Sequence, residues 1–221
     1  MTETDTPQAP VMMARLNEPA PDFTQESTAG PLSLKSFRGK RVVLFSHPAD
    51  FTPVCTTEFI GFAELHDQFE ARNVQLIGLS VDSVHAHIAW LKNIEANFGV
   101  EVKFPVLADL DMKVAKAYGM IQPGASATAA VRAVFLIDPE GILRAMIYYP
   151  LTTGRNMAEI LRLIDALQCN VAHGLATPAN WQPGDACIVP APGTKAGADK
   201  RPSEGYDTID WYFSRTPQPK S

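Results

Sequence analysis

Cys55 is the residue whose place in the sequence best fits a chemical role. It follows a short apolar run, and Pro53 favours the first turn of a helix, which makes Thr52 the capping residue of that helix. The first backbone N–H groups of a helix lack partners within the helix, and with the helix dipole they stabilise negative charge. A thiol at this place is therefore expected to ionise readily to the thiolate, the form of cysteine that acts as a nucleophile.

The two other cysteines, Cys169 and Cys187, are expected to be inert, buried side chains. No two cysteines are separated by only two residues, as a zinc site or a thiol–disulfide oxidoreductase normally requires. The positions two residues from Cys55 hold Pro53 and Thr57. We therefore expect no metal, no disulfide framework and at least one free, reactive thiol.

The middle of the chain alternates between apolar runs typical of buried strands and patterns typical of helices. The predicted strands are residues 42–45, 74–81, 106–107, 131–137 and 142–149. The predicted helices are residues 54–72, 84–98, 112–118 and a last one that Asn156 caps. Parallel units come first and a hairpin with a helix comes last, which favours a thioredoxin-like α/β fold with a central mixed sheet flanked by helices on both faces.

One predicted helix, residues 84–98, contains two histidines. Its buried face is predicted to consist of large apolar residues, namely Ile88, Leu91, Ile94 and Phe98. His85 and His87 stand two apart and do not face each other on a helix, so both are expected to be solvated and not to bind metal.

The end of the chain differs from the middle, because seven of the 18 prolines fall within residues 171–221. A short strand is predicted at 187–189, and residues 195–205 are expected to be mobile. The apolar and aromatic cluster 209–213 is too large for so small an arm to bury, so it is expected to pack on the main domain or on another subunit. The predicted division is a flexible tail 1–13, a thioredoxin-like domain 14–170 and a C-terminal domain 171–221.

Composition excludes several classes of partner. The formal net charge is −5, which argues against nucleic acid as the main partner. No apolar run approaches the roughly 20 residues of a membrane-spanning helix, so no membrane partner is expected. The first ten residues are polar and acidic and do not resemble a secretory signal peptide, so a cytoplasmic location is expected.

A family resemblance rests on the string from Pro48 to Cys55, PADFTPVC, which matches the P-x-x-x-T/S-x-x-C active-site motif of the peroxiredoxins. The longer string 47–58 resembles the one-cysteine subfamily. Further segments resemble that subfamily in the same order, at 118–121, 123–125, 131–135, 152–156 and 176–181. The resemblance extends over residues 14–219. It implies a thioredoxin-like peroxidase domain, a C-terminal dimerisation domain and a homodimer or larger homo-oligomer.

The resemblance also implies roles for residues around Cys55, which becomes the peroxidatic nucleophile. Thr52 positions the hydroperoxide, and Arg132 stands beside the sulfur as a cation with several hydrogen-bond donors. Pro48 shapes the loop and shields the sulfur from solvent. On the residues alone, Arg132 is also readable as a surface charge at a strand end, although a buried arginine there would need a partner.

Three supporting residues are implied as well. Glu58 organises the two arginines, Arg132 and Arg155, and His47 donates to the thiolate or to a bound peroxide. On the residues alone, Glu58 is only an acid in a first helical turn. By the same reasoning Arg155 is also interpretable as a solvated loop charge, and His47 as a loop histidine fixed by Pro48.

The implied reaction reduces hydrogen peroxide and organic hydroperoxides through a sulfenic acid on Cys55, without a cofactor. An external thiol, either a small thiol or a thioredoxin- or glutaredoxin-like protein, then regenerates Cys55. One alternative is a redox-sensing or holdase oligomer controlled by oxidation of Cys55. A phospholipase is a further alternative, but Ser36 in segment 34–40 lacks the flanking glycines of a nucleophile elbow, so no such activity is expected.

The arm lacks an obvious partner for the sulfenic acid. Some relatives, notably archaeal ones, carry two further cysteines there, and the aligned positions in this chain are Thr208 and Ser214. Neither residue forms a disulfide, and nothing in the sequence places Cys169 or Cys187 near Cys55. We therefore expect a one-cysteine cycle.

Overall fold

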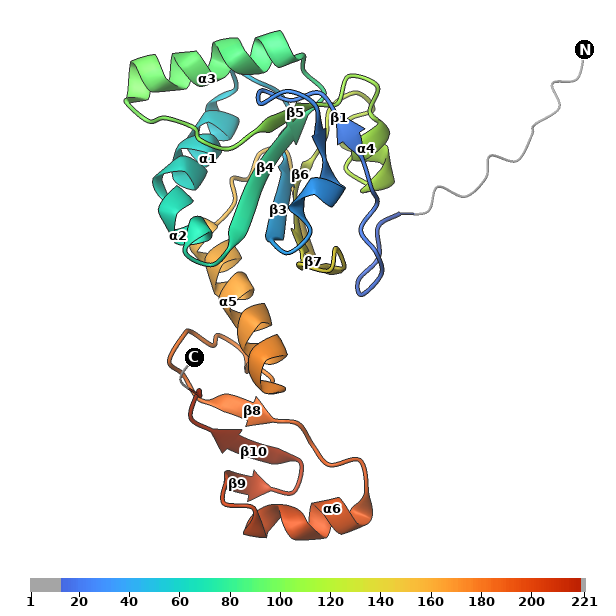
Figure 1. Ribbon diagram of the computed structural model, residues 1–221, viewed down its shortest axis with the longest axis vertical. Helices are drawn as coiled ribbons and strands as arrows, with labels where there is room; N and C mark the ends of the chain where they lie inside the picture. Colours follow the sequence, from blue (N-terminus) through green and yellow to red (C-terminus); the bar gives the residue numbers. More distant parts are fainter. Residues whose placement is uncertain (1–12, 220–221) are drawn as a thin grey trace, which may run out of the picture. The chain divides into compact units, whose positions relative to one another are not determined.

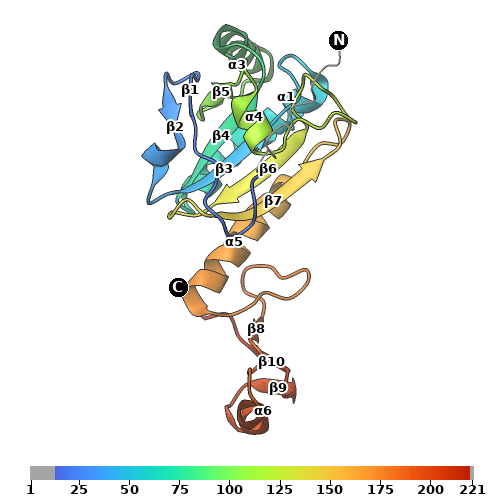
Figure 2. The same cartoon turned by 90° about the vertical axis from the view of Figure 1, so that its right-hand side faces the viewer.

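A five-stranded mixed sheet forms the centre of the N-terminal part of the computed structural model, which describes residues 13–219 (Figure 1). Its strands are β3 (Arg41–Ser46), β4 (Val74–Ser80), β5 (Val106–Ala108), β6 (Arg132–Ile137) and β7 (Leu143–Tyr149). The order is β5-β4-β3-β6-β7, with β5 and β7 at the edges (Figure 2). Strands β3, β4 and β5 run parallel, whereas β6 is antiparallel to both β3 and β7. This topology confirms the predicted thioredoxin-like fold.

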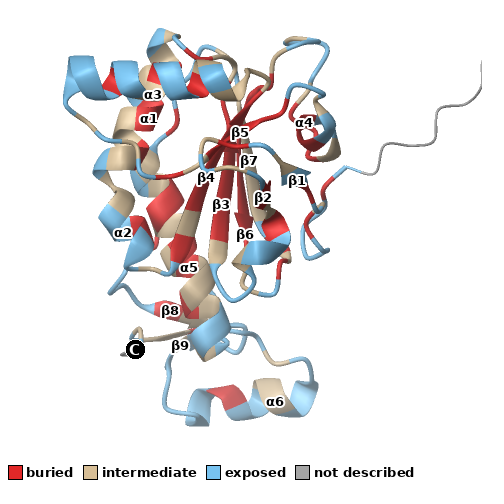
Figure 3. Ribbon diagram, turned by 45° about the horizontal axis from the view of Figure 1, so that its top comes forward, coloured by how far each residue is buried: buried red, intermediate tan, exposed pale blue. Residues whose placement is uncertain are grey.

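The central strands are buried along most of their length (Figure 3). Because successive side chains of a strand point to opposite faces, the sheet separates two groups of apolar residues. On one face Leu44 and Ile77 pack with Val114 of α4 (Lys113–Ala117). On the other face Phe45 stacks on Phe62 of α1 (Pro53–Glu64) with ring centroids 4.1 Å apart. Helices therefore cover both faces, as predicted.

The predicted helix 54–72 is two helices, because the chain breaks at Leu65 between α1 and α2 (His66–Glu70). The predicted helix 84–98 is α3 (Val84–Phe98), which starts at a Ser83 cap and ends at Gly99 in the left-handed region. Its predicted buried face was right for Ile94, which is fully buried, and wrong for two other residues. Ile88 and Phe98 are exposed, and the buried residues of the helix are His87, Trp90 and Ile94.

Short elements precede the sheet, namely β1 (Thr24–Gln25), β2 (Leu32–Ser33) and the 3-10 helix η1 (Leu34–Phe37). Strands β1 and β2 pair with each other as an antiparallel two-stranded sheet. The sequence pattern did not predict them, because each is too short to show a periodicity.

The chain divides into two units, the first ending at Arg155 and the second beginning at Asn156. The second unit opens with α5 (Met157–His173), whose cap Asn156 accepts a hydrogen bond from the Glu159 amide at 3.3 Å. It continues with a three-stranded sheet of β8 (Cys187–Val189), β9 (Asp207–Asp210) and β10 (Phe213–Thr216), in the order β8-β10-β9. The short strand predicted at 187–189 is therefore confirmed.

The segment 195–205, expected to be mobile, contains two helices. They are α6 (Lys195–Lys200) and the 3-10 helix η2 (Arg201–Ser203). The Thr194 hydroxyl caps α6 by accepting from the Gly197 amide at 3.1 Å. Across residues 13–219, none of the helices combines the length and the hydrophobicity needed to cross a bilayer.

Candidate active site

The site forms where several chain segments of the N-terminal unit meet at the end of β3. That strand ends at Ser46, and a loop leads to Pro53, the first residue of α1. Arg132 opens β6, which runs antiparallel beside β3. The Ser46 hydroxyl joins the two strand ends, because it donates to Val131 O at 2.6 Å and accepts from the Ala133 amide at 3.1 Å. Sequence reasoning did not single out Ser46.

Cys55 lies in the first turn of α1 and is fully buried. Arg132 Nη1 lies 3.3 Å from Cys55 Sγ and donates toward it. The same nitrogen lies 2.6 Å from Glu58 Oε2, and Arg132 Nε donates to Leu151 O at 3.0 Å. The guanidinium of Arg132 is therefore fixed beside the sulfur by partners on two sides, and the alternative of a solvated surface charge is excluded.

Arg155 holds Glu58 from the other side. Its Nε and Nη2 lie 2.9 and 2.6 Å from the two carboxylate oxygens of Glu58, and its own amide donates to Oε1 at 2.9 Å. Its Nη1 donates to Ser46 O and to Ala133 O at 2.9 and 3.0 Å. Burial lowers the pKa of Arg155, and the neighbouring charge of Glu58 acts against that effect. Arg155 is thus a buried residue that ties the two strands to α1, and not a solvated loop charge.

The cluster of Arg132, Glu58 and Arg155 has a net positive charge when the sulfur of Cys55 is not counted. Arg132 and Arg155 each carry one positive charge, because a guanidinium stays protonated in proteins, and Glu58 carries one negative charge. All three side chains are at most 3% exposed, so water screens them little. The cluster therefore holds one positive charge in excess, which a thiolate on Cys55 neutralises.

Thr52 is the N-cap residue of α1, as predicted, and its side chain makes no capping hydrogen bond. Its hydroxyl instead donates to Ala49 O at 3.0 Å, which leaves the oxygen lone pairs free to accept. Pro48 lies half-buried in the same loop. The loop also contains Phe51, whose φ of 56° is in the left-handed region that a bulky side chain rarely adopts. Such strained residues concentrate at functional sites.

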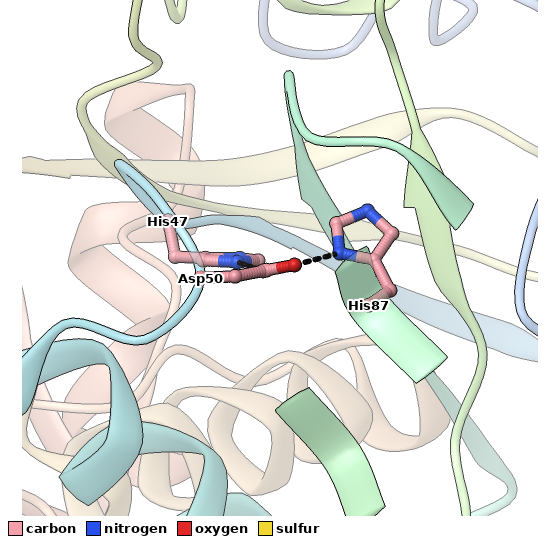
Figure 4. Close-up of side chains that lie close together, drawn as sticks. All are labelled: His47, Asp50 and His87. Atoms are coloured by element: carbon pink, nitrogen blue, oxygen red, sulfur yellow. Dashed lines mark hydrogen bonds and ion pairs between the residues drawn. The ribbon is translucent and has the colours of Figure 1, made fainter. Parts of the chain in front are cut away.

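His47 forms a buried network with two residues that the sequence did not connect with it (Figure 4). Its Nε2 lies 2.9 Å from Asp50 Oδ1, and His87 Nδ1 lies 2.8 Å from Asp50 Oδ2. The prediction that His87 is solvated was wrong, because it is fully buried and its Nε2 lies 3.1 Å from Leu107 O. His85 is exposed, as expected.

The network also fixes where protons lie. Leu107 O can only accept, so His87 Nε2 carries a proton and His87 Nδ1 faces Asp50. His47 donates through Nε2 to Asp50, which leaves its buried Nδ1 without a hydrogen-bond partner. Histidine and aspartate also ligate metals, and these ligand atoms lie within 4.8 Å of one another. The N–O distances are those of hydrogen bonds, so we interpret the cluster as a hydrogen-bond network.

The pKa values of His47 and Asp50 are both lowered from their usual values. Burial lowers the pKa of His47 below 6.5, and the hydrogen bond and charge of Asp50 offset this only in part. Burial by itself raises the pKa of Asp50, but hydrogen bonds from His47 and His87 outweigh it and hold that pKa below 3.8. His47 is therefore neutral and Asp50 ionised near neutral pH.

The lowered pKa of His47 predicts a pH-dependent stability. As the pH falls below 6.5, the unfolded chain binds a proton that the folded His47 does not accept, so the free energy of unfolding decreases. The decrease from this residue approaches about 1.4 kcal/mol per pH unit until the pH reaches its lowered folded pKa. Urea unfolding at several pH values between neutral and mildly acidic measures this slope.

The matched variants are His47→Gln and His85→Gln. Glutamine at position 47 keeps an N–H donor toward Asp50 but does not titrate, so the slope is expected to become shallower. His85 is exposed, and its replacement is expected to leave the slope as in the wild-type chain. An unchanged slope in His47→Gln would assign the pH dependence to other groups.

Two sequence signals pointed toward this network. Asp50 stands three residues after His47 within the active-site string, and His87, Trp90 and Ile94 follow helical spacing on α3. The alternative site at Ser36 gains no support, because its hydroxyl donates to Ser33 O at 2.6 Å and, among the interactions of the described residues, contacts no histidine.

Comparison with known proteins agrees with the geometry of this site. Residues 16–146 match the AhpC/TSA family, and residues 166–204 match the C-terminal domain of 1-Cys peroxiredoxin. A peroxiredoxin of Aquifex aeolicus is 56% identical over 216 residues, which cover 93% of this chain and 97% of the relative. A peroxiredoxin of Methanosarcina mazei is 52% identical over 211 residues, 91% and 96% of the two chains.

Solved structures give the same result. A cysteine mutant of peroxiredoxin 6 of Arenicola marina has a TM-score of 0.83 and 42% identity, and the match covers 94% of this chain and 99% of that one. A yeast mitochondrial 1-Cys peroxiredoxin also has a TM-score of 0.83, with 40% identity and coverage of 93% and 100%. The family match, the relatives and the buried Cys55–Arg132 contact lead to one conclusion: the chain belongs to the AhpC/TSA family and is a peroxiredoxin of the one-cysteine type.

Proposed function

We propose that Cys55 is the residue through which this thiol-dependent peroxidase reduces hydroperoxides. The observation that carries the proposal is the 3.3 Å contact between Arg132 Nη1 and Cys55 Sγ in a buried cluster with one excess positive charge. Such a site offers a fixed cationic donor at the reacting atom.

The reaction proceeds in two balanced steps. The Cys55 thiolate attacks the terminal oxygen of the hydroperoxide, a new S–O bond forms and the O–O bond breaks. The leaving oxygen takes a proton and departs as water or an alcohol, and Cys55 becomes a sulfenic acid. Two external thiols then return Cys55 to the thiol, and the products of that step are one disulfide and one water.

The surrounding residues divide this work. Arg132 donates to the oxygens of the O–O bond as negative charge moves from sulfur to the leaving oxygen. The free lone pairs of Thr52 Oγ1 accept the hydrogen bond of the incoming peroxide, and Pro48 limits the access of water. Glu58 and Arg155 hold Arg132 in place. His47 acts through Asp50, to which it donates, and not by donating to the sulfur.

The reductant is an external thiol, and we propose glutathione or a thioredoxin-like protein. The solved yeast relative is described as resolved through the glutathione and thioredoxin systems, which supports this choice. Thr208 and Ser214 align with the arm cysteines of other relatives. Their hydroxyl oxygens lie 3.0 Å apart and form a hydrogen bond. The cytoplasmic location expected from the sequence stays a prediction.

Peroxide consumption by the purified, reduced protein with dithiothreitol tests the proposed nucleophile. Cys55→Ser is expected to reduce turnover to the background reaction of dithiothreitol, because a serine hydroxyl is not ionised at neutral pH. The double variant Cys169→Ser/Cys187→Ser is expected to keep wild-type turnover. Turnover that survives in Cys55→Ser would place the reaction elsewhere, and a wild-type chain that binds partners without turnover would favour the sensor or holdase alternative.

We also propose that the cluster 209–213 is an interface between two copies of the chain. Ile209, Trp211 and Tyr212 are 68%, 47% and 55% exposed, although residues of this kind normally avoid water. Trp211 and Tyr212 form the turn between β9 and β10, with ring centroids 5.7 Å apart. An exposed aromatic patch of this kind is typical of an association surface.

Replacing both turn residues tests the interface. Truncation would remove β9 and β10, so Trp211→Ser/Tyr212→Ser is the better variant, because it leaves the strands intact. Both copies of a two-fold dimer carry the substitutions, so four aromatic side chains are lost from the interface. At about 1.5 kcal/mol each, this weakens association about 10,000-fold. Light scattering after size-exclusion chromatography is expected to show at least a dimer for the wild-type chain and dissociation for the variant. A wild-type mass that the substitutions leave unchanged would contradict this interface.

A further inference from the structure

Two thiols lie next to each other in the C-terminal unit, which does not contain Cys55. Cys169 is on α5, Cys187 is on β8, and their sulfur atoms are 3.6 Å apart. Both are free thiols and both are buried, at 5% and 0% exposure. The sequence places them 18 residues apart, with no motif that would join them.

The surroundings of the Cys169–Cys187 pair are mostly apolar, so each sulfur has the other as its nearest hydrogen-bonding group. They belong to a small apolar cluster with Ala166 and Trp181, against which Leu175 packs. Cys187 Sγ donates weakly toward Asp185 O at 4.0 Å, so its lone pairs are left to accept from Cys169. A sulfur–sulfur separation of 3.6 Å leaves less than 2 Å of movement before the S–S bond length of about 2.05 Å is reached.

We propose that Cys169 and Cys187 are a second redox site, a dithiol that excess hydroperoxide converts into an intramolecular disulfide without the participation of Cys55. One thiol attacks the terminal oxygen of the peroxide and becomes a sulfenic acid, and the rest of the peroxide leaves as water or an alcohol. The second thiol attacks the sulfenic sulfur, the S–S bond forms and one water leaves. In sum, two thiols and one hydrogen peroxide give one disulfide and two waters.

This site is slower than the site at Cys55. Burial and the neighbouring Cys187 raise the pKa of the Cys169 thiol to about 11, so little Cys169 thiolate exists at neutral pH. No guanidinium contacts the pair among the interactions of the described residues, in contrast to the contact between Arg132 and Cys55. The dithiol therefore reacts when peroxide exceeds what Cys55 removes, and its disulfide forms only under that excess.

The disulfide would tie the last turns of α5 to β8 and close the loop 170–186. A cross-link of this kind stabilises a fold mainly by restricting the unfolded chain. The effect matters most where the apolar core is small, as it is in this unit, whose described cluster holds few large side chains. The oxidised chain is thus expected to have a more stable C-terminal unit than the reduced chain.

The test uses the full chain with Cys55→Ser, so its result does not depend on the role of Cys55. The reduced variant is treated with excess hydrogen peroxide, denatured, and alkylated to count free thiols. Intact mass and a peptide map then locate any link. We expect loss of both alkylatable thiols, a mass decrease of two hydrogens, and one linked peptide pair containing Cys169 and Cys187. Dithiothreitol is expected to restore both thiols.

The control is Cys55→Ser/Cys187→Ser, which retains only Cys169 and is expected to show no loss of two hydrogens. Urea unfolding gives a second readout, because oxidised Cys55→Ser should have a higher midpoint than the reduced form. The matched control is Cys55→Ser/Cys169→Ser/Cys187→Ser, whose midpoint should not change with peroxide. Two thiols that remain alkylatable would overturn the proposal. Separate sulfinic or sulfonic acids on the two cysteines would also overturn it.

Discussion

Arg132→Met is expected to slow the reaction of reduced Cys55 with hydrogen peroxide by about 100- to 1,000-fold, the usual effect of removing one donor from a site of developing negative charge. Methionine fills a similar volume but has neither charge nor N–H groups. Without Arg132, the charges of Glu58 and Arg155 cancel, so a thiolate on Cys55 becomes an uncompensated buried charge. The variant therefore loses both the cation at the sulfur and the donor to the leaving oxygen.

Stopped-flow measurement of the second-order rate constant with peroxide provides the comparison. The matched control is Arg144→Met, because Arg144 of β7 pairs with Asp138 and the side chain of Arg144 is 37% exposed. That control is expected to react at the wild-type rate. A wild-type rate in Arg132→Met, with the fold verified by circular dichroism, would remove Arg132 from the mechanism.

Glu58→Gln is expected to lower the free energy of unfolding by about 3–5 kcal/mol, the range for breaking a buried ion pair by removing one partner. Glu58 accepts hydrogen bonds from Arg132 and from three nitrogens of Arg155, and it is 2% exposed. Glutamine keeps the shape but removes the carboxylate charge that the two buried guanidinium groups share. A loss of this size is a large part of the total stability of a typical domain.

Urea denaturation of wild type and variant measures the difference. Glu159→Gln is the matched control, since Glu159 pairs with Arg162 through both carboxylate oxygens but lies near the surface of α5. Exposed pairs contribute at most about 1 kcal/mol, so the control is expected to unfold close to the wild type. Equal midpoints for the two variants would show that the buried cluster does not stabilise the fold.

The parts of the site that the sequence predicted best are those set by local structure. The position of Cys55 follows from a buried strand, a proline and a helix start within a dozen residues, and the structure has these elements in that order. The mixed sheet flanked by helices was predictable for the same reason, because β3, β4 and β6 are continuous apolar runs whose connections allow few topologies.

Other features depend on contacts between distant residues. Arg155 lies 97 residues from Glu58, and only the folded chain shows that it is buried and not solvated. His87 was assigned to the exposed face of α3. The predicted buried stripe and the observed one both contain Ile94, but the predicted stripe begins at Ile88 and the observed one at His87. Strands β9 and β10 are short and mostly polar, and the residue of β10 that is buried is Ser214, so neither shows the apolar alternation that identifies a half-buried strand.

The most direct test of the one-cysteine assignment is the mass of the reduced wild-type chain after one equivalent of hydrogen peroxide without a reductant. We predict that the chain gains the mass of one oxygen atom, that a sulfenic-acid trap such as dimedone reacts at Cys55, and that excess peroxide converts the product to a sulfinic acid. Cys55→Ser should show no such adduct. A stoichiometric disulfide between Cys55 and Cys169 or Cys187, or consumption of the peroxide with Cys55 unmodified, would contradict the assignment.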